Sequence, residues 1–347
     1  MSPAAQFYLI SLLVYAGVSI IACWGLDLEY GQTGVLNFGF VVFQAAGAYT
    51  AALLTLGPSG SNPYEHYIWG AHWPYPLPVA AAAVVGAVLS VPVGFVALRR
   101  LRADYQAISM LVLSLIATTV VTNANGLFDG SRGLFLIPQP LQSTLSSLTP
   151  LGYQWFYVGL LVVFVLGALW VVNRISRAPL GRTLRAVRDN ESAATALGKN
   201  VLSLRMGAFI VGNMLAAVSG ALLVQFIGAW SPNGWLYPET FVYFGALIIG
   251  GTGNKLGVLI GAIVLPVGIS EGVRYLPQFG RPGLVDAIEF GLIGVLIIVF
   301  MWFRPKGILP ERKRKYPPTV LVSSSSPTSP KQALRQSVVQ RRPGLEG

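Results

Sequence analysis

Residues 153–172 read YQWFYVGLLVVFVLGALWVV, a run without a charged side chain. A helix of about 20 apolar residues is long enough to cross the hydrocarbon core of a bilayer, which is about 30 Å thick. Similar runs occupy most of the chain up to residue 303, and 54% of all residues are hydrophobic against 11% charged. A soluble domain could not hide that much apolar surface from water. We therefore predict an all-α, polytopic integral membrane protein.

Working outward from this run gives about nine predicted transmembrane helices, within a range of eight to ten. The second is interrupted by glycines and the seventh is short, so either could be broken or re-entrant, which membranes tolerate where neighbouring helices shield the backbone. The topology of residues 27–56 and 239–272 is therefore left open. The predicted spans are residues 6–26, 33–56, 77–98, 105–124, 153–172, 206–228, 239–252, 255–272 and 284–303.

The positive charge gathers in three segments between or after the spans. Arg99, Arg100 and Arg102 form the first, the loop 173–205 has seven Lys and Arg, and the tail from Arg304 onward has ten, which makes 20 of the 24 in the chain. Lys and Arg accumulate on the cytoplasmic side of membrane proteins. We therefore predict that these segments are cytoplasmic. An odd number of spans then puts the N-terminus outside and the C-terminus in the cytoplasm.

The net charge of +11 thus reports topology, and we expect no nucleic-acid binding because no organised basic face is visible. We predict a transmembrane domain over residues 1–309. The basic, Ser/Pro-rich and aperiodic segment 310–347 is predicted to be a disordered cytoplasmic tail. The outer connections are rich in aromatics and prolines, which fits either an aromatic belt at the membrane interface or a rim for an external solute-binding protein.

The longest basic loop contains GRTLRAVRDNESAATALGKNVLSLR, residues 181–205. Leu184 and Val187 share one helical face by their spacing, and so do Ala194 and Leu197. Good N-cap residues, Asp189 and Asn190, separate these pairs, and Gly198 is a plausible helix stop. The loop therefore predicts short amphipathic helices at the membrane surface, suited to inserting into a partner protein.

Within this loop, Ala193, Ala194 and Gly198 form the pattern AA-x-x-x-G, with Glu191 just before it. The pattern resembles the coupling loop of ABC importer permeases, and the wider stretch GRTLRAVRDNESAATALGKNVLSLRMGAFIVG is similar to that of branched-chain amino acid permeases. The acid sits one residue earlier than in the general importer motif. Further blocks in the family's order extend the resemblance over residues 24–312: GQTGVLNFGFVVFQAAGAYTAALL, ADYQAISMLVLS, GSRGLFLIP, GALIIGGTGNKLGVLIGA and FRPKGILP.

The resemblance implies the permease subunit of an ATP-binding-cassette importer for branched-chain or similar small neutral amino acids. It implies a second related permease subunit, two ATP-binding subunits that use ATP and Mg²⁺, and an external solute-binding protein. No enzymatic activity and no cofactor are expected on this chain. Many relatives have a His where this chain has Phe40, so no role of that His is carried over. The coupling residues implied are Gly181, Arg182, Leu184, Arg185, Val187, Arg188, Asp189, Asn190, Glu191, Ala193, Ala194, Leu197 and Gly198.

Other functions have less support in the sequence. GGTGNKLG contains Lys255 but not the Gly-Lys-Ser/Thr spacing of a phosphate-binding loop, so ATP hydrolysis is expected from a separate subunit. An ion-coupled carrier usually needs an acid deep in the membrane, and Glu239, Glu271, Asp286 and Glu289 lie near predicted span ends. A urea or short-amide importer remains an alternative. One cysteine and two histidines give a redox enzyme or a metal site little material, and no metal is expected.

Polar residues inside apolar runs are the candidates for a translocation path, because a transported solute must be held weakly inside the bundle. Buried Thr and Asn can equally bond their own helix, and both interpretations stay open. Glycines at 253, 257 and 261 recur every four residues, which predicts close helix packing inside the chain or a seam with a second subunit. The path candidates are Gln32, Thr33, Asn37, Gln44, Thr118, Thr119, Thr122 and Asn123.

Overall fold

The computed structural model describes residues 2–58, 67, 70–142, 145, 147–274 and 284–311, with the side chains of Arg100, Arg274 and Asp286 left aside. The described residues belong to one compact unit that extends to Glu311. The predicted disordered tail lies outside the described residues apart from its first two positions, as does His66, so these predictions and the domain boundary near residue 309 stay predictions.

Helices make up the architecture of the described residues, which confirms the all-α prediction, and each predicted span is helical over most of its length. In the part of the chain that the structure describes, six helical segments are long and apolar enough to cross a membrane. The elements are α1 Pro3–Leu26, η1 Asp27–Gly31, α2 Phe40–Thr55, α3 Leu77–Arg100, α4 Ala103–Asn123, α5 Asn125–Phe128, α6 Pro150–Arg177, α7 Pro179–Asp189, α8 Glu191–Ala196, α9 Val201–Ile227, η3 Pro232–Gly234, α10 Pro238–Gly250, α11 Lys255–Ile263, η4 Val264–Ile269, α12 Ser270–Arg274 and α13 Leu284–Phe303.

The second and seventh predicted spans have the expected irregularities. Residues 34–39 are not helical, so the second span begins as an extended turn and becomes helical only from Phe40. The seventh, α10, has only 13 residues. The first span continues past its predicted end, because η1 prolongs α1 as a π-helix to Gly31. This extension carries Asp27 and Glu29 into the bundle.

Helix α9 is the centre of the core and packs against α1, α2 and α3. Its approach to α2 depends on glycines: a Cβ at Gly47 would collide with the backbone of Ala217, and one at Gly220 with the backbone of Gln44. By contrast, only 22% of the apolar window of α4 and of α6 is buried, and both helices have several exposed apolar side chains. Such surfaces suit lipid or another membrane subunit, because hydrocarbon is as apolar as the side chains themselves.

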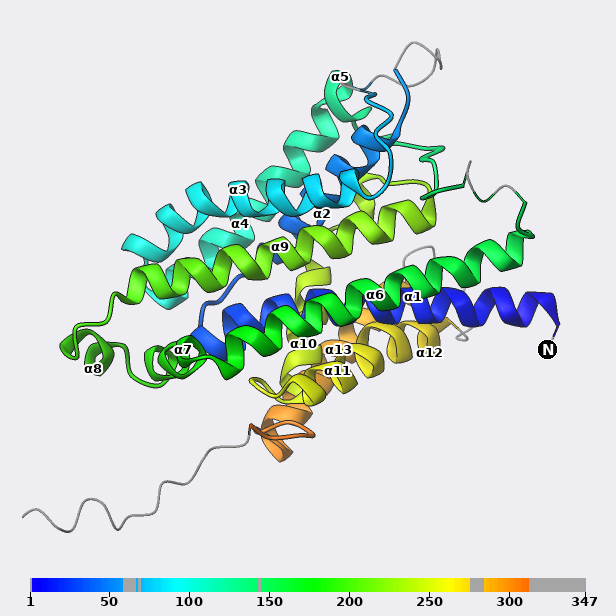
Figure 1. The fold of residues 1–347 in the computed structure, drawn as a ribbon. Coiled ribbons are helices and arrows are strands. Elements are labelled where there is room, and N and C mark those ends of the chain that lie inside the picture. The colour runs from blue at the N-terminus through cyan, green and yellow to red at the C-terminus, as the bar shows by residue number, and fades with distance from the viewer. Residues whose placement is uncertain are drawn as a thin grey trace, which may run out of the picture. The chain divides into compact units, whose positions relative to one another are not determined.

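The three basic segments lie at the same end of the helices. In Figure 1, the α3–α4 junction, α7 and α8 are at the end away from the N-terminus of α1. The third segment joins them because Glu311 forms ion pairs with α7. The three segments that are rich in Lys and Arg therefore lie at one end of the structure. The assignment of that end to the cytoplasm stays a prediction.

Candidate functional site

Helix α7 is amphipathic and lies between α6 and α8 at the basic end of the structure. Its apolar face is formed by Gly181, Leu184 and Val187, which follow one another at three-residue intervals and are all buried. Pro179 occupies the start of the helix, where a missing backbone N–H removes no helical bond. Arg182 on the opposite side is exposed. The predicted face of the loop is thus present, and it packs against this chain.

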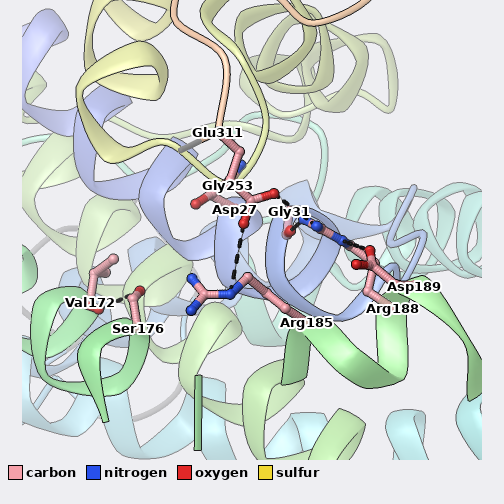
Figure 2. A network of polar contacts seen from close by, with 9 residues as sticks. All are labelled: Asp27, Gly31, Val172, Ser176, Arg185, Arg188, Asp189, Gly253 and Glu311. Atoms are coloured by element: carbon pink, nitrogen blue, oxygen red, sulfur yellow. Dashed lines mark hydrogen bonds and ion pairs between the residues drawn. The ribbon is translucent and has the colours of Figure 1, made fainter. Parts of the chain in front are cut away.

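Arg188 connects α7 to two distant parts of the chain (Figure 2). One terminal nitrogen donates to the carbonyl oxygen of Gly31, at the end of η1. The other donates to a carboxylate oxygen of Glu311 at 2.8 Å, and Nε is 3.2 Å from Asp189. Arg185 adds a weaker ion pair with Glu311 at 3.7 Å. The planar guanidinium can make these contacts together because its donors point in fixed directions.

These partners keep the guanidinium of Arg188 protonated. Burial lowers the pKa of the guanidinium, but the hydrogen bonds and charges of Glu311 and Asp189 outweigh that effect and leave the pKa above its usual value. The Arg188–Glu311 pair is mostly buried, with side-chain exposures of 20% and 15%. It should therefore be less sensitive to salt than an exposed pair.

The surroundings of this junction come from the start and the end of the chain. Asp27 accepts a hydrogen bond of 2.8 Å from the backbone N–H of Gly253, in the turn between α10 and α11. The backbone of residues 308–309 bonds the carbonyls of Ile249 and Gly250. The end of α1, the α10–α11 turn and the C-terminal segment therefore form one surface that α7 contacts through Arg188.

Helix α8 has the predicted caps but not the predicted face. Asn190 caps it by accepting from the backbone N–H of Ala193, and Gly198 follows it with a positive φ of 74°. Ala194 is buried. Leu197, however, follows the last helical residue and is 79% exposed, so the expectation of a shared apolar face with Ala194 is wrong. Glu191 forms an ion pair of 2.9 Å with Arg205 on α9.

A second polar cluster lies deeper, between η1, the turn before α2, and α9. Asn37 donates to Glu29 at 2.8 Å and to the side-chain oxygen of Asn213 at 3.1 Å. The side-chain oxygen of Asn37 accepts from the backbone N–H of Gly39. The side chains of Glu29, Asn37 and Asn213 are fully buried, with 0% exposure. We call these three residues the polar lock, because their side chains join three separate elements.

The predicted path residues fall into two groups. Thr33 bonds the backbone of Glu29, Asn37 belongs to the polar lock, and Gln32 is fully buried nearby in sequence. The candidates on α4 instead bond carbonyls one turn earlier on their own helix. None of these hydrogen bonds joins one group to the other. The α4 group consists of Thr118, Thr119, Thr122 and Asn123.

A cavity of 720 Å³ opens among α1, α2, α10, the α11–α12 region and α13. Of the eight path candidates, only Gln44 lines it, and its side chain donates to the hydroxyl of Tyr243 at 3.0 Å. Arg132 lines the same cavity. So do three acids that the sequence placed near span ends: Glu239, Glu271 and Glu289.

The glycines of the repeat pack within the chain. A Cβ at Gly257 would collide with the backbone of Gly250, and one at Gly261 with that of Ala246. These contacts join α11 to α10 and account for both glycines without a second subunit. Gly253 lies in the turn before α11 with a positive φ of 78°.

Sequence reasoning missed several residues of these clusters. Asp27 and Glu29 were placed outside the first span, although two acids directly after an apolar run could have signalled a buried helix end. Asn213 is one of three polar residues in the predicted span 206–228, with Ser219 and Gln225, and a polar residue within a span is a usable signal. Nothing in the sequence marks Glu311 as a partner of Arg188, because 123 residues separate them.

The comparisons with known proteins all point to the family that the sequence resembles. A family model described as "Branched-chain amino acid transport system / permease component" matches residues 8–301. The chain is 30% identical over 317 residues to the high-affinity branched-chain amino acid transport system permease protein LivM of Escherichia coli (strain K12), covering 84% of this chain and 68% of that protein. It is 24% identical to the probable LivM of Methanocaldococcus jannaschii, covering 88% and 94%. It is 27% identical to LivH of Salmonella typhimurium, covering 82% and 89%. No solved structure matches.

Proposed function

This chain belongs to the permease component family of branched-chain amino acid transport systems, and we propose that it is the membrane-spanning subunit of an ATP-driven importer for branched-chain or similar small neutral amino acids. It is a multi-pass membrane protein. The observation that carries the proposal is the family match over most of the chain. The amphipathic loop of α7 and α8, positioned at the basic end of the helices, supports it independently.

We propose that α7 and α8 contact a separate ATP-binding subunit on the cytoplasmic side of the inner membrane. The exposed Leu197 and the small exposed Ala193 suit insertion into a cleft, because the adjoining apolar face of α7 is already anchored to this chain. Two such ATPases would use ATP and Mg²⁺. A second, related permease subunit and an external binding protein complete the assembly, and relatives of this chain include both LivM and LivH proteins.

The cavity beside Gln44 is the proposed entrance for solute. Its wall combines carboxylates, an arginine and aromatic side chains, so it can contact both charged groups of an amino acid. It also has room for more than one small solute, which fits a path that holds its cargo weakly.

Uptake in cells that express the complete transport operon tests the substrate. Labelled leucine, isoleucine and valine should accumulate, and accumulation should disappear when this gene alone is deleted and return when it is restored. Accumulation of urea or a short amide in place of these amino acids would favour the alternative importer. Uptake abolished by a protonophore at constant ATP would overturn the ATP-driven mechanism.

The role of the loop has its own test. Leu197→Asp should abolish uptake while the subunit stays folded in the membrane, because the side chain is 79% exposed. Leu136→Asp is the matched control, since Leu136 is also a highly exposed leucine, at 75%, but lies outside the loop and outside the predicted spans. Equal uptake by the two variants would remove Leu197 from the proposed ATPase contact.

A further inference from the structure

The first turn of α7 is held by the end of α6. The turn between the two helices is tight, because a Cβ at Gly181 would collide with the backbone oxygens of Ile175 and Ser176. The end of α6 is itself tied to the start of α11, where the ammonium of Lys255 donates to the side-chain oxygen of Asn173. The first turn of α7 therefore follows α6 and α11 and can act as the fixed end of the helix.

The last turn of α7 is held in a different way. It lies about 14 Å from the start of the helix, at a rise of about 1.5 Å per residue. Val187 is buried there, with 1% exposure, but burial alone does not fix a direction because the hydrophobic effect is non-directional. Arg188 supplies the direction, since two of its nitrogens donate to Gly31 and to Glu311. A guanidinium presents its donors in a rigid fork, so these bonds set the orientation of the turn.

The elements that meet Arg188 also contact one another. Gly31 lies so close to the α10–α11 turn that a Cβ there would be 2.9 Å from the backbone nitrogen of Gly253. A Cβ at Gly253 would in turn be 3.1 Å from the carboxyl carbon of Glu311 and 3.3 Å from a terminal nitrogen of Arg188. The end of η1, the α10–α11 turn and the C-terminal segment therefore form one packed seat for the guanidinium.

A mostly buried ion pair suits an orienting role better than a purely stabilising one. Apolar side chains of similar volume often stabilise a protein as well as a buried ion pair does. The pair of Arg188 and Glu311 adds a defined geometry between segments that are 123 residues apart in the chain. Loss of either partner leaves the other charge mostly buried, because the two side chains are only 20% and 15% exposed. Each partner therefore depends on the other.

We propose that Arg188 and Glu311 are the positioning residues of the loop formed by α7 and α8. Their ion pair fixes the last turn of α7 to η1, the α10–α11 turn and the C-terminal segment, so that a push on the loop moves the ends of α1, α10 and α11. The inference rests on the proposed function, because it takes an ATP-binding subunit as the source of the push. Without the pair, α7 pivots about its first turn, and the ATPase binds a loop that no longer transmits its movement.

A double-mutant cycle in the complete transporter tests this role. The complex is reconstituted in vesicles with its permease partner, ATPases and binding protein, and is made with Arg188→Gln, with Glu311→Gln and with both. Two quantities are measured: the rate of ATP hydrolysis, and the leucine transported per ATP hydrolysed. Lys306→Gln is the matched control, because it also removes one charge and Lys306 is an exposed residue of the same C-terminal segment.

Arg188→Gln should lower the leucine transported per ATP by about tenfold, in the range typical of coupling between two sites. ATP hydrolysis should continue, because α8 with its exposed Leu197 still contacts the ATPase. Glu311→Gln should lower the ratio by about fivefold, since Arg188 keeps its bond to Gly31. The double variant should match Arg188→Gln and not show the product of about fiftyfold, because the two residues share one interaction. Lys306→Gln should match the wild type in both measurements.

A purely structural role predicts a different result. Fewer complexes would assemble, and transport and hydrolysis would fall together at a constant ratio. A constant ratio in Arg188→Gln, or losses that multiply in the double variant, would overturn the inference.

A second variant covers the case in which Arg188→Gln does not assemble. Arg188→Lys then replaces it, because lysine keeps the charge but cannot reproduce the planar fork. The leucine transported per ATP should still fall by about fivefold, and a wild-type ratio would overturn the inference. Failure of the proposed function would look different, because the wild-type complex itself would then accumulate no leucine with ATP.

Discussion

Two stretches of this chain have the same kind of sequence and opposite structural roles. The second predicted span and the fourth each place several polar side chains within an apolar run. In the second, Asn37 and Gln44 reach across to α9 and α10 and are almost completely buried. In the fourth, Thr119 and Asn123 bond carbonyls of α4 itself and face outward.

The difference follows from backbone geometry more than from residue type. A regular helix such as α4 offers each Thr a carbonyl one turn back, and a hydroxyl that takes it needs no other helix. The turn at 34–39 has no such ladder. Its polar groups must therefore find partners on other elements, which is why a broken span becomes a joint between elements.

The largest effect should come from adding bulk where the second span meets α9. Gly47→Leu places side-chain atoms where the backbone of Ala217 lies, so α2 and α9 must separate. We expect a loss of about 4 kcal/mol or more, enough to prevent folding. Thr119→Leu on the exposed face of α4 is the comparison variant and should fold normally. Size-exclusion chromatography of the detergent-solubilised subunit measures both, and a monodisperse Gly47→Leu protein would contradict the close packing of α2 on α9.

Much of the fold could be predicted from the sequence because spans depend on local composition. Each predicted span is helical over most of its length, and the glycines before Phe40 correctly indicated a break. The clusters could not be predicted to the same degree. Glu311 and Arg188, or Asn37 and Asn213, become neighbours only through packing of distant segments. When a helix is apolar on all sides, its sequence does not indicate which face is buried in the protein. The polar residues of α4 and those of the second span were therefore equally good candidates for the path.

Removal of the lock's central side chain should have the next largest effect. Asn37→Leu leaves the buried carboxylate of Glu29 without its side-chain donor and Asn213 without the donor to its oxygen. An unsatisfied buried group of this kind costs about 3 kcal/mol. The thermal unfolding midpoint of the solubilised subunit should fall accordingly. Thr118→Val, the α4 counterpart, should leave the midpoint near that of the wild type, and equal midpoints for the two variants would remove the distinction between the spans.

A smaller effect is expected at Gln44, where the second span contacts α10. Gln44→Leu removes one hydrogen bond to Tyr243, and interhelical bonds in membrane proteins contribute about 1 kcal/mol. Leucine uptake by the complete transporter should fall severalfold, because Gln44 also lines the cavity. Tyr243→Phe should have a similar effect on stability, and the double variant should be no less stable than the worse single variant. Independent, additive losses would mean that the two side chains do not act through their shared bond.

The smallest effect is expected on α4. Thr119→Val removes a hydroxyl that serves only its own helix, and Asn123→Leu does the same for an amide near the helix end. Each should change stability by less than about 0.5 kcal/mol and leave leucine uptake at the wild-type level, because neither side chain holds another element. Uptake by the complete transporter and unfolding of the isolated subunit are measured together. A sharp loss of uptake with unchanged stability would assign the exposed face of α4 to a path or a seam shared with the second permease subunit.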